Sequence, residues 1–193
     1  MNFLGHAFLS FHQPETLVGN MIGDFIKGNE ALHKLPEQIQ KGVMLHRNID
    51  TFTDSHPAIT RSKTYFREDY RLYAGAFVDG MLDHFLANDP KCFESESKLL
   101  EFSQNVYQTV KEYQEVLPEK FLKVIERMSE DNWLFHYRTL KGTKKLFEGI
   151  VYRAKYLETN ADSAFNTLVV NYYMLNQCYY EFIDDVIPFV KNF

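Results

Sequence analysis

The stretch KGVMLHRNIDTFTDSHP, residues 41–57, carries the most informative pattern in this chain of 193 residues. Proline is favoured at the first position of a helix and disrupts a helix interior, so the prolines around this stretch predict one helix over residues 36–53. His46 and Asp50 are four residues apart, and Asp54 lies four further on. Because residues four apart lie on one face of a helix, the spacing predicts that His46 and Asp50 point the same way.

An imidazole and a carboxylate on one helix face suit a divalent metal such as manganese. Arg47 follows His46 directly and could hold a phosphate oxygen with two hydrogen bonds. A surface pair of His46 and Asp50, without a metal, is the alternative interpretation.

The rest of the chain is also predicted to be helical, with one all-α domain over residues 1–193. Six prolines and nine glycines interrupt the sequence, and no Asn-Gly or Asp-Gly hairpin joins two alternating runs. A hydrophobic fraction of 45%, with 17 Phe and 12 Tyr, supplies material for a core. The other predicted helices cover residues 2–12, 15–26, 58–67, 71–86, 96–116, 119–128, 131–139, 143–157 and 163–191.

Three further apolar segments in the first half carry His or Asp. They are NFLGHAFLS with His6, GNMIGDFIKG with Asp24, and FVDGMLDHFL with Asp79, Asp83 and His84. Burying a carboxylate is costly unless it is paired or bound to a metal. One metal pocket would explain why all four segments turn His or Asp inward.

Each group also has an alternative interpretation without a metal. His6 can be a hydrogen-bonded core histidine and Asp24 a helix or turn residue. Asp79, Asp83 and His84 can form an exposed polar edge.

Composition and motifs argue against several other classes of protein. The net charge of −5 lacks the basic excess of a typical nucleic-acid-binding protein. No run approaches the roughly 20 apolar residues of a membrane span, and the N-terminus lacks the basic region of a signal peptide. Two distant cysteines are expected to be reduced thiols of a cytoplasmic protein. There is no serine nucleophile elbow, P-loop or glycine-rich dinucleotide turn.

Four motifs, MNFLGH, GNMIGDFIKG, LHRNIDTFTDSHP and VDGMLDHFL, occur in this order within residues 1–90. Together they resemble the acyl carrier protein phosphodiesterase family, as does the later DNWLFHYR. The resemblance implies a helical fold distantly related to the HD-type metal phosphohydrolases. It also implies hydrolysis of holo-acyl carrier protein to apo-protein and free 4′-phosphopantetheine, with a divalent cation that is typically manganese, magnesium being possible.

Carried over by position, the resemblance implies a set of metal ligands and a set of surrounding motif residues. The ligands are His6, Asp24, His46 and Asp83, and the motif residues are Arg47, Asp50, Asp79 and His84. Arg47 or Lys27 would offset charge on the phosphoryl oxygens, and His84 or His46 would protonate the leaving serine. Asp50 or Asp79 would orient a histidine. Two departures are Phe8, at a position where the family often has a second histidine, and the reversed order of Asp83-His84 relative to the His-Asp pair of HD proteins.

The implied partner, holo-acyl carrier protein, is strongly acidic, so basic patches are candidate docking sites; the oligomeric state stays open. One patch comprises Arg61, Lys63, Arg67 and Arg71, and the other comprises Lys141, Lys144, Lys145, Arg153 and Lys155. Ordinary solvated faces are the alternative for both. Two other functions also fit the sequence: a metal phosphohydrolase for another phosphoester, such as a nucleotide, and a non-catalytic helical interaction protein.

Overall fold

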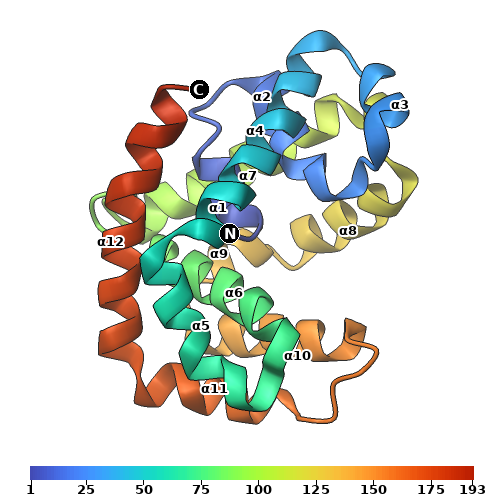
Figure 1. The fold of residues 1–193 in the computed structure, drawn as a ribbon. Coiled ribbons are helices and arrows are strands. Elements are labelled where there is room, and N and C mark those ends of the chain that lie inside the picture. Colours follow the sequence, from blue (N-terminus) through green and yellow to red (C-terminus); the bar gives the residue numbers. More distant parts are fainter.

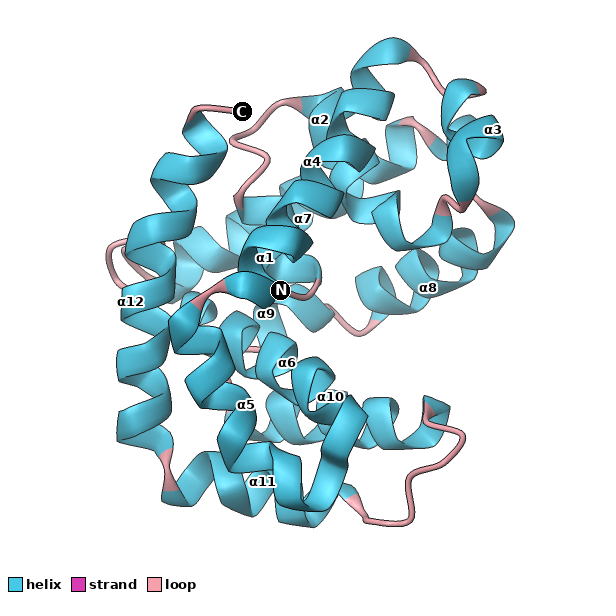
Figure 2. Ribbon diagram, in the orientation of Figure 1, coloured by secondary structure: helices cyan, strands magenta, loops and turns pink.

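The computed structural model describes residues 1–193 and consists of helices and the loops that join them, without a strand (Figure 1, Figure 2). The α-helices are α1 (Phe3–Phe8), α2 (Pro14–Ile22), α3 (Gly28–His33), α4 (Glu37–Ser55), α5 (Pro57–Tyr70), α6 (Ala74–Ala87), α7 (Glu96–Glu112), α8 (Glu119–Glu130), α9 (Trp133–His136), α10 (Leu140–Arg153), α11 (Ala161–Val170) and α12 (Tyr172–Lys191). Three short 3-10 helices are η1 (Gly23–Phe25), η2 (Arg71–Tyr73) and η3 (Gln114–Val116). The prediction of an all-α fold is confirmed.

Local side-chain chemistry explains where several helices begin. Pro57 occupies the first turn of α5, and Nδ1 of His56 accepts a hydrogen bond from the backbone N–H of Ala58 at 3.2 Å. At the start of α10, the hydroxyl of Thr139 accepts from the N–H of Gly142 at 2.9 Å. Such caps satisfy backbone donors that have no partner within the helix.

The structure differs from the predicted helix over residues 163–191, which is two helices. Asn171 separates α11 from α12, and its side-chain amide donates to the carbonyl of Thr167 at 2.9 Å. Asparagine competes for backbone hydrogen bonds in this way and therefore favours helix ends. Helix α11 crosses the lower edge of the view and α12 rises along one side (Figure 1). The prediction also missed α3, because Gly28 was interpreted only as a helix stop.

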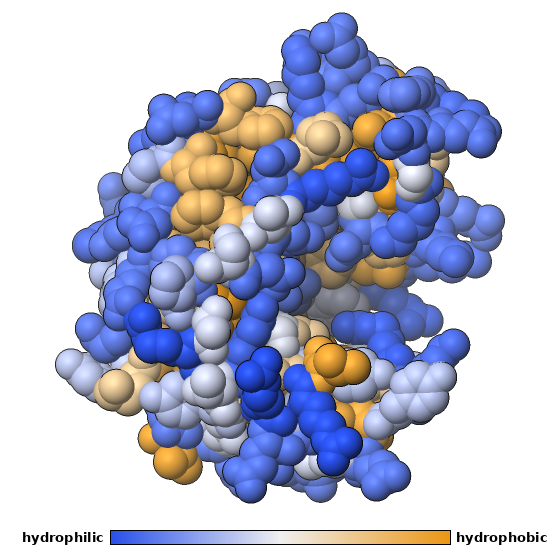
Figure 3. Space-filling view, in the orientation of Figure 1, coloured by the Kyte–Doolittle hydropathy of each residue, from blue (hydrophilic) through white to orange (hydrophobic).

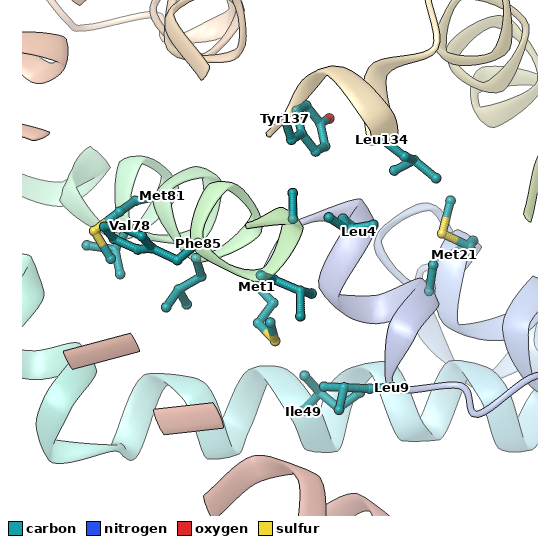
Figure 4. Close-up of a cluster of buried hydrophobic side chains, with 14 of the residues drawn as sticks. Met1, Leu4, Leu9, Met21, Ile49, Val78, Met81, Phe85, Leu134 and Tyr137 are labelled. Carbon is teal, nitrogen blue, oxygen red and sulfur yellow. The ribbon is translucent and has the colours of Figure 1, made fainter. Parts of the chain in front are cut away.

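One hydrophobic core of 47 buried residues runs through the molecule, with α6 at its centre. Helix α6 packs against α1, α5 and α10. Figure 4 shows Leu4 of α1, Ile49 of α4 and Phe85 of α6 in the same apolar cluster. The short helix α1 is therefore held between longer helices, which fixes the position of its one histidine.

Glycines allow α2 and α4 to cross in backbone contact. A Cβ atom on Gly19 would lie 2.1 Å from the carbonyl oxygen of Ile39, and one on Gly42 would lie 2.4 Å from that of Thr16. No larger residue fits at either position without moving a helix. This close crossing brings the residue after Gly19, which is Asn20, against the middle of α4.

Helix α12 packs along α4 and α5. Both cysteines, Cys92 and Cys178, are free thiols, as predicted. None of the helices has the length and apolar content needed to cross a membrane.

Candidate metal centre

His6 of α1 and His46 and Asp50 of α4 meet beside Asp24 of η1. Nε2 of His6 lies 3.2 Å from Oδ1 of Asp50, and Nε2 of His46 lies 3.2 Å from Oδ2 of the same carboxylate. Oδ1 of Asp24 is 3.6 Å from Nε2 of His46. One potential ligand atom from each of His6, His46 and Asp50 falls within 4.8 Å of the other two. Both imidazoles are buried, whereas the side chains of Asp50 and Asp24 are 42% and 75% exposed. The centre therefore opens to solvent on its carboxylate side.

Asn20 of α2, which is fully buried, holds both imidazoles. Its side-chain Oδ1 lies 2.8 Å from Nδ1 of His6, and its main-chain carbonyl oxygen lies 2.7 Å from Nδ1 of His46. Its Nδ2 donates to the carbonyl of His6 at 2.7 Å and to the hydroxyl of Ser10 at 3.0 Å, which fixes the orientation of the amide. Because an oxygen of this kind only accepts, both imidazoles donate through Nδ1.

This assignment leaves Nε2 of each neutral imidazole with a lone pair that faces carboxylate oxygens. Nε2 of His46 is buried and has no hydrogen-bond partner. Lone pairs directed at a carboxylate repel it, and a buried polar atom without a partner costs free energy. Only a cation between these atoms, a proton or a metal ion, removes both penalties.

The pKa values of the two histidines diverge. Burial lowers the pKa of His6, and the charge of neighbouring His46 lowers it further. Burial also acts to lower the pKa of His46, but its contacts with Asp24 and Asp50 outweigh burial and raise the pKa to about 9. The imidazole rings are stacked, with centroids 3.9 Å apart and an angle of 16° between planes. Two positively charged imidazolium rings at this distance would repel each other, so at most one of the two rings carries a second proton.

The carboxylates complete a negatively charged centre. Contact with His46 lowers the pKa of Asp24. Burial acts to raise the pKa of Asp50, yet its contacts with His46 and His6 prevail and hold it well below the usual range. Both groups are thus anionic at neutral pH. Two imidazole nitrogens and two carboxylates, with lone pairs directed at one another, fit a divalent cation chemically.

Two cationic side chains flank the centre. Arg47 is half-buried beside His46, and its Nη2 donates to the carbonyl of Ile26 at 3.2 Å. Lys27 follows Ile26 and is exposed. Both positions are consistent with contacts to an anionic ligand that approaches the open side.

Comparison with known proteins identifies the family. The sequence profile of the acyl carrier protein phosphodiesterase family matches residues 1–186. The chain belongs to this family.

Two relatives named acyl carrier protein phosphodiesterase illustrate the likeness. The protein of Enterobacter sp. (strain 638) is 29% identical over 192 residues, covering 100% of this chain and 98% of its own. The protein of Yersinia enterocolitica is 29% identical over 182 residues, covering 94% of this chain and 93% of its own. The family name denotes a hydrolase, which agrees with the sequence prediction. No solved structure matches the chain significantly.

Asp83, implied as a ligand by the likeness to the phosphodiesterase family, lies outside the cluster. Its carboxylate accepts hydrogen bonds from the backbone N–H groups of Leu4 at 2.8 Å, Gly5 at 3.1 Å and Asn2 at 3.3 Å. Burial raises the pKa of Asp83 to about 7, although these donors oppose the rise. With its oxygens occupied in this way, Asp83 anchors the start of α1 and thereby supports His6.

Two other family-motif residues on α6 are also engaged elsewhere. Asp79 pairs with the N-terminal ammonium of Met1 at 3.0 Å. His84 is buried, with Nδ1 2.8 Å from the carbonyl of Tyr137 and Nε2 3.0 Å from the hydroxyl of Tyr172. Both nitrogens of His84 therefore have protein partners, unlike those of the histidines in the cluster.

The sequence interpretation missed Asn20 and Gly23. Asn20 lies in the apolar run LVGNMI, so the argument that singled out Asp24 could have found it. A Cβ atom on Gly23 would lie 2.2 Å from Cγ of His46, so this glycine makes room for the imidazole. That role depends on a contact between segments that sequence spacing does not reveal.

Proposed function

We propose that this protein hydrolyses the phosphodiester that joins 4′-phosphopantetheine to the serine of holo-acyl carrier protein, with a divalent cation held by His6, His46 and Asp50 together with Asp24. The observation that carries the proposal is the convergence of two buried imidazoles, each with its Nε2 facing a carboxylate, in a chain of the acyl carrier protein phosphodiesterase family. Asp50 replaces Asp83 in the proposed ligand set, because Asp83 is occupied by backbone donors.

A divalent cation bound there, manganese or magnesium, would offset charge on the phosphoryl oxygens and make water a better nucleophile near neutral pH. The side chains of the protein supply binding and orientation. Asn20 fixes both imidazoles by accepting hydrogen bonds from their Nδ1–H groups. Such supporting hydrogen bonds hold ligands in one tautomer and one orientation.

Arg47 is proposed to bind a phosphoryl oxygen, because it extends from α4 next to His46 and retains N–H groups beyond the one bonded to Ile26. In the reaction, the oxygen of water bonds to phosphorus and the bond from phosphorus to serine Oγ breaks. The serine Oγ takes up a proton, and 4′-phosphopantetheine leaves as a phosphate monoester. The open side of the centre, where Asp24 is exposed, gives solvent access for that proton.

A mass measurement tests the proposal. Holo-acyl carrier protein is incubated with the protein and manganese, and the carrier is expected to lose the mass of phosphopantetheine. A parallel incubation with a chelator is expected to leave the carrier unchanged, and replacing manganese with magnesium compares the two cations.

An unchanged carrier in the presence of manganese would contradict the proposed substrate. Assays with nucleotides and a small phosphodiester then separate another phosphohydrolase from a non-catalytic protein. Full activity in the chelated sample would contradict the proposed cation.

A further inference from the structure

The substrate proposed above restricts where the carrier can dock. The phosphorus is attached directly to a serine Oγ, so only a short side-chain link separates the reacting bond from the surface of the carrier. A patch that recognises the carrier must therefore adjoin the centre formed by His6, His46 and Asp50. Charge alone does not choose between the two basic patches, because both contain cations without an ion-pair partner.

A series of neighbouring residues connects the patch on α5 to the centre. Asp54 lies one helical turn beyond Asp50 on α4, and its carboxylate pairs with the ammonium of Lys63 at 2.7 Å. A Cβ atom on Gly75 of α6 would lie 3.6 Å from Cε of Lys63. Asp79, one turn along α6 from Gly75, pairs with the N-terminal ammonium. The side chain of Lys63 thus lies close to both α4, which carries His46 and Asp50, and α6.

Cations without a partner continue from Lys63 along α5. Arg67 lies one turn beyond Lys63, and Arg71 follows at the end of the helix. Both are exposed, and neither has a carboxylate within ion-pair distance. Leu72 comes next and is 98% exposed. Cationic side chains beside an exposed apolar residue are typical of a surface that binds a partner.

The patch on α10 lies on another side of α6. A Cβ atom on Gly80 of α6 would meet Leu146 of α10 at 2.2 Å. Gly80 follows Asp79 directly, and successive helical residues point about 100° apart. Helix α10 therefore packs on a different side of α6 from Asp79. Lys144 of this patch is already paired with Asp162 at 2.7 Å.

We infer that the carrier protein docks on the surface formed by Arg47, Lys63, Arg67, Arg71 and Leu72, which we call the α4–α5 surface. This inference rests on the proposed function for the identity of the partner. The cations of this surface would complement the strongly acidic carrier that the family resemblance implies. Figure 3 views the molecule from the side on which α4 and α5 lie in front; hydrophilic side chains predominate there, with apolar areas near the C-terminal end of α12 and in the lower part of the view.

Matched charge reversals test the inference. The double variant Arg67→Glu/Arg71→Glu alters the α4–α5 surface, and Lys141→Glu/Lys145→Glu makes the same charge change on α10. For the first variant, the KM for holo-acyl carrier protein is expected to rise at least about tenfold with kcat unchanged, because steering and docking are lost while the chemistry is not. For the second, KM is expected to stay within about twofold of the wild type. Hydrolysis of bis(p-nitrophenyl) phosphate, which has no protein part, is expected to be equal in all three proteins.

Binding of fluorescently labelled holo-acyl carrier protein, measured by anisotropy, separates the two proposals. If the wild type binds but does not cleave the carrier, the proposed function fails, and the docking inference is judged by which variant loses binding. Absence of binding to the wild type would overturn the docking inference. So would equal losses in both variants, or a loss confined to the α10 variant.

Discussion

Two groups of His and Asp residues, one on α4 and one on α6, look alike in sequence and differ in structure. His46 and Asp50 are four residues apart, as are Asp79 and Asp83, and His84 follows. On α6 the carboxylate of Asp83 and both nitrogens of His84 have protein donors or acceptors. On α4 the Nε2 of His46 makes no well-aligned hydrogen bond and instead faces two carboxylates, with Asp50 at 3.2 Å and Asp24 at 3.6 Å.

The difference teaches that a polar residue in an apolar helix does not by itself indicate a site. Burial requires that its polar atoms find partners, and protein groups can provide them all. A bound ligand is indicated where the protein holds one nitrogen of an imidazole by a hydrogen bond and leaves the other nitrogen facing carboxylate oxygens. The α6 group supports the structure, and the α4 group is available for a cation.

The largest expected effect comes from His46→Ala. Removing this imidazole should lower kcat for the proposed reaction at least about a thousandfold, because cation stabilisation worth several kcal/mol is lost and each ~1.4 kcal/mol is a factor of ten. Manganese binding, measured by calorimetry, should weaken in parallel. His33→Ala, the same change on the exposed face of α3, is the control and should match the wild type. Wild-type activity in His46→Ala would mean that the α4 group, like the α6 group, has no role in catalysis.

The next effect is on stability and comes from Asp83→Ala. The change leaves the N–H groups of Asn2, Leu4 and Gly5 without their acceptor, and each unsatisfied buried donor costs about 1–3 kcal/mol. The free energy of unfolding in urea should therefore fall by about 3 kcal/mol or more, while the folded protein still binds manganese. Asp83→Asn retains one acceptor oxygen and should lose less. Loss of manganese binding at unchanged stability would instead place Asp83 among the ligands.

The sequence predicted most of the fold because its helices are bounded by proline, glycine and capping residues that act locally. Residues 36–53 illustrate this, since the observed α4 differs from the prediction by only two residues at its C-terminal end and one at its start. Sequence patterns did not reveal the break at Asn171. An asparagine on the polar face of a continuous helix would look the same in the sequence as one that ends a helix. For this reason α11 and α12 were predicted as one helix.

The structure brings several of the predicted site residues together. His6, Asp24 and His46 do meet, together with Asp50. Asp83 does not, because its partners are backbone groups of α1, and no sequence pattern distinguishes a carboxylate that binds backbone N–H groups from one that binds a metal.

Asn20→Leu gives the smallest expected effect and the finest test of the α4 group. The substitution removes the acceptor for Nδ1 of His6 and leaves the main-chain carbonyl that accepts from Nδ1 of His46. In the metal-free protein, correlation spectra of the imidazole nitrogens should therefore show that His6 loses its fixed Nδ1–H tautomer while His46 keeps it. Manganese affinity should fall about 10–100-fold, as expected when a hydrogen bond that supports a ligand is lost.

Asn48→Leu is the matched control, because Asn48 is half-buried on α4 and bonds only the carbonyl of Met44. It should change neither tautomer. If Asn20 only supported the local fold, Asn20→Leu would change the tautomers of both imidazoles or of neither. The hydrogen bonds of Asn20 instead predict that only His6 changes. An unchanged His6 tautomer in Asn20→Leu would show that the side chain of Asn20 does not prepare this imidazole for a cation.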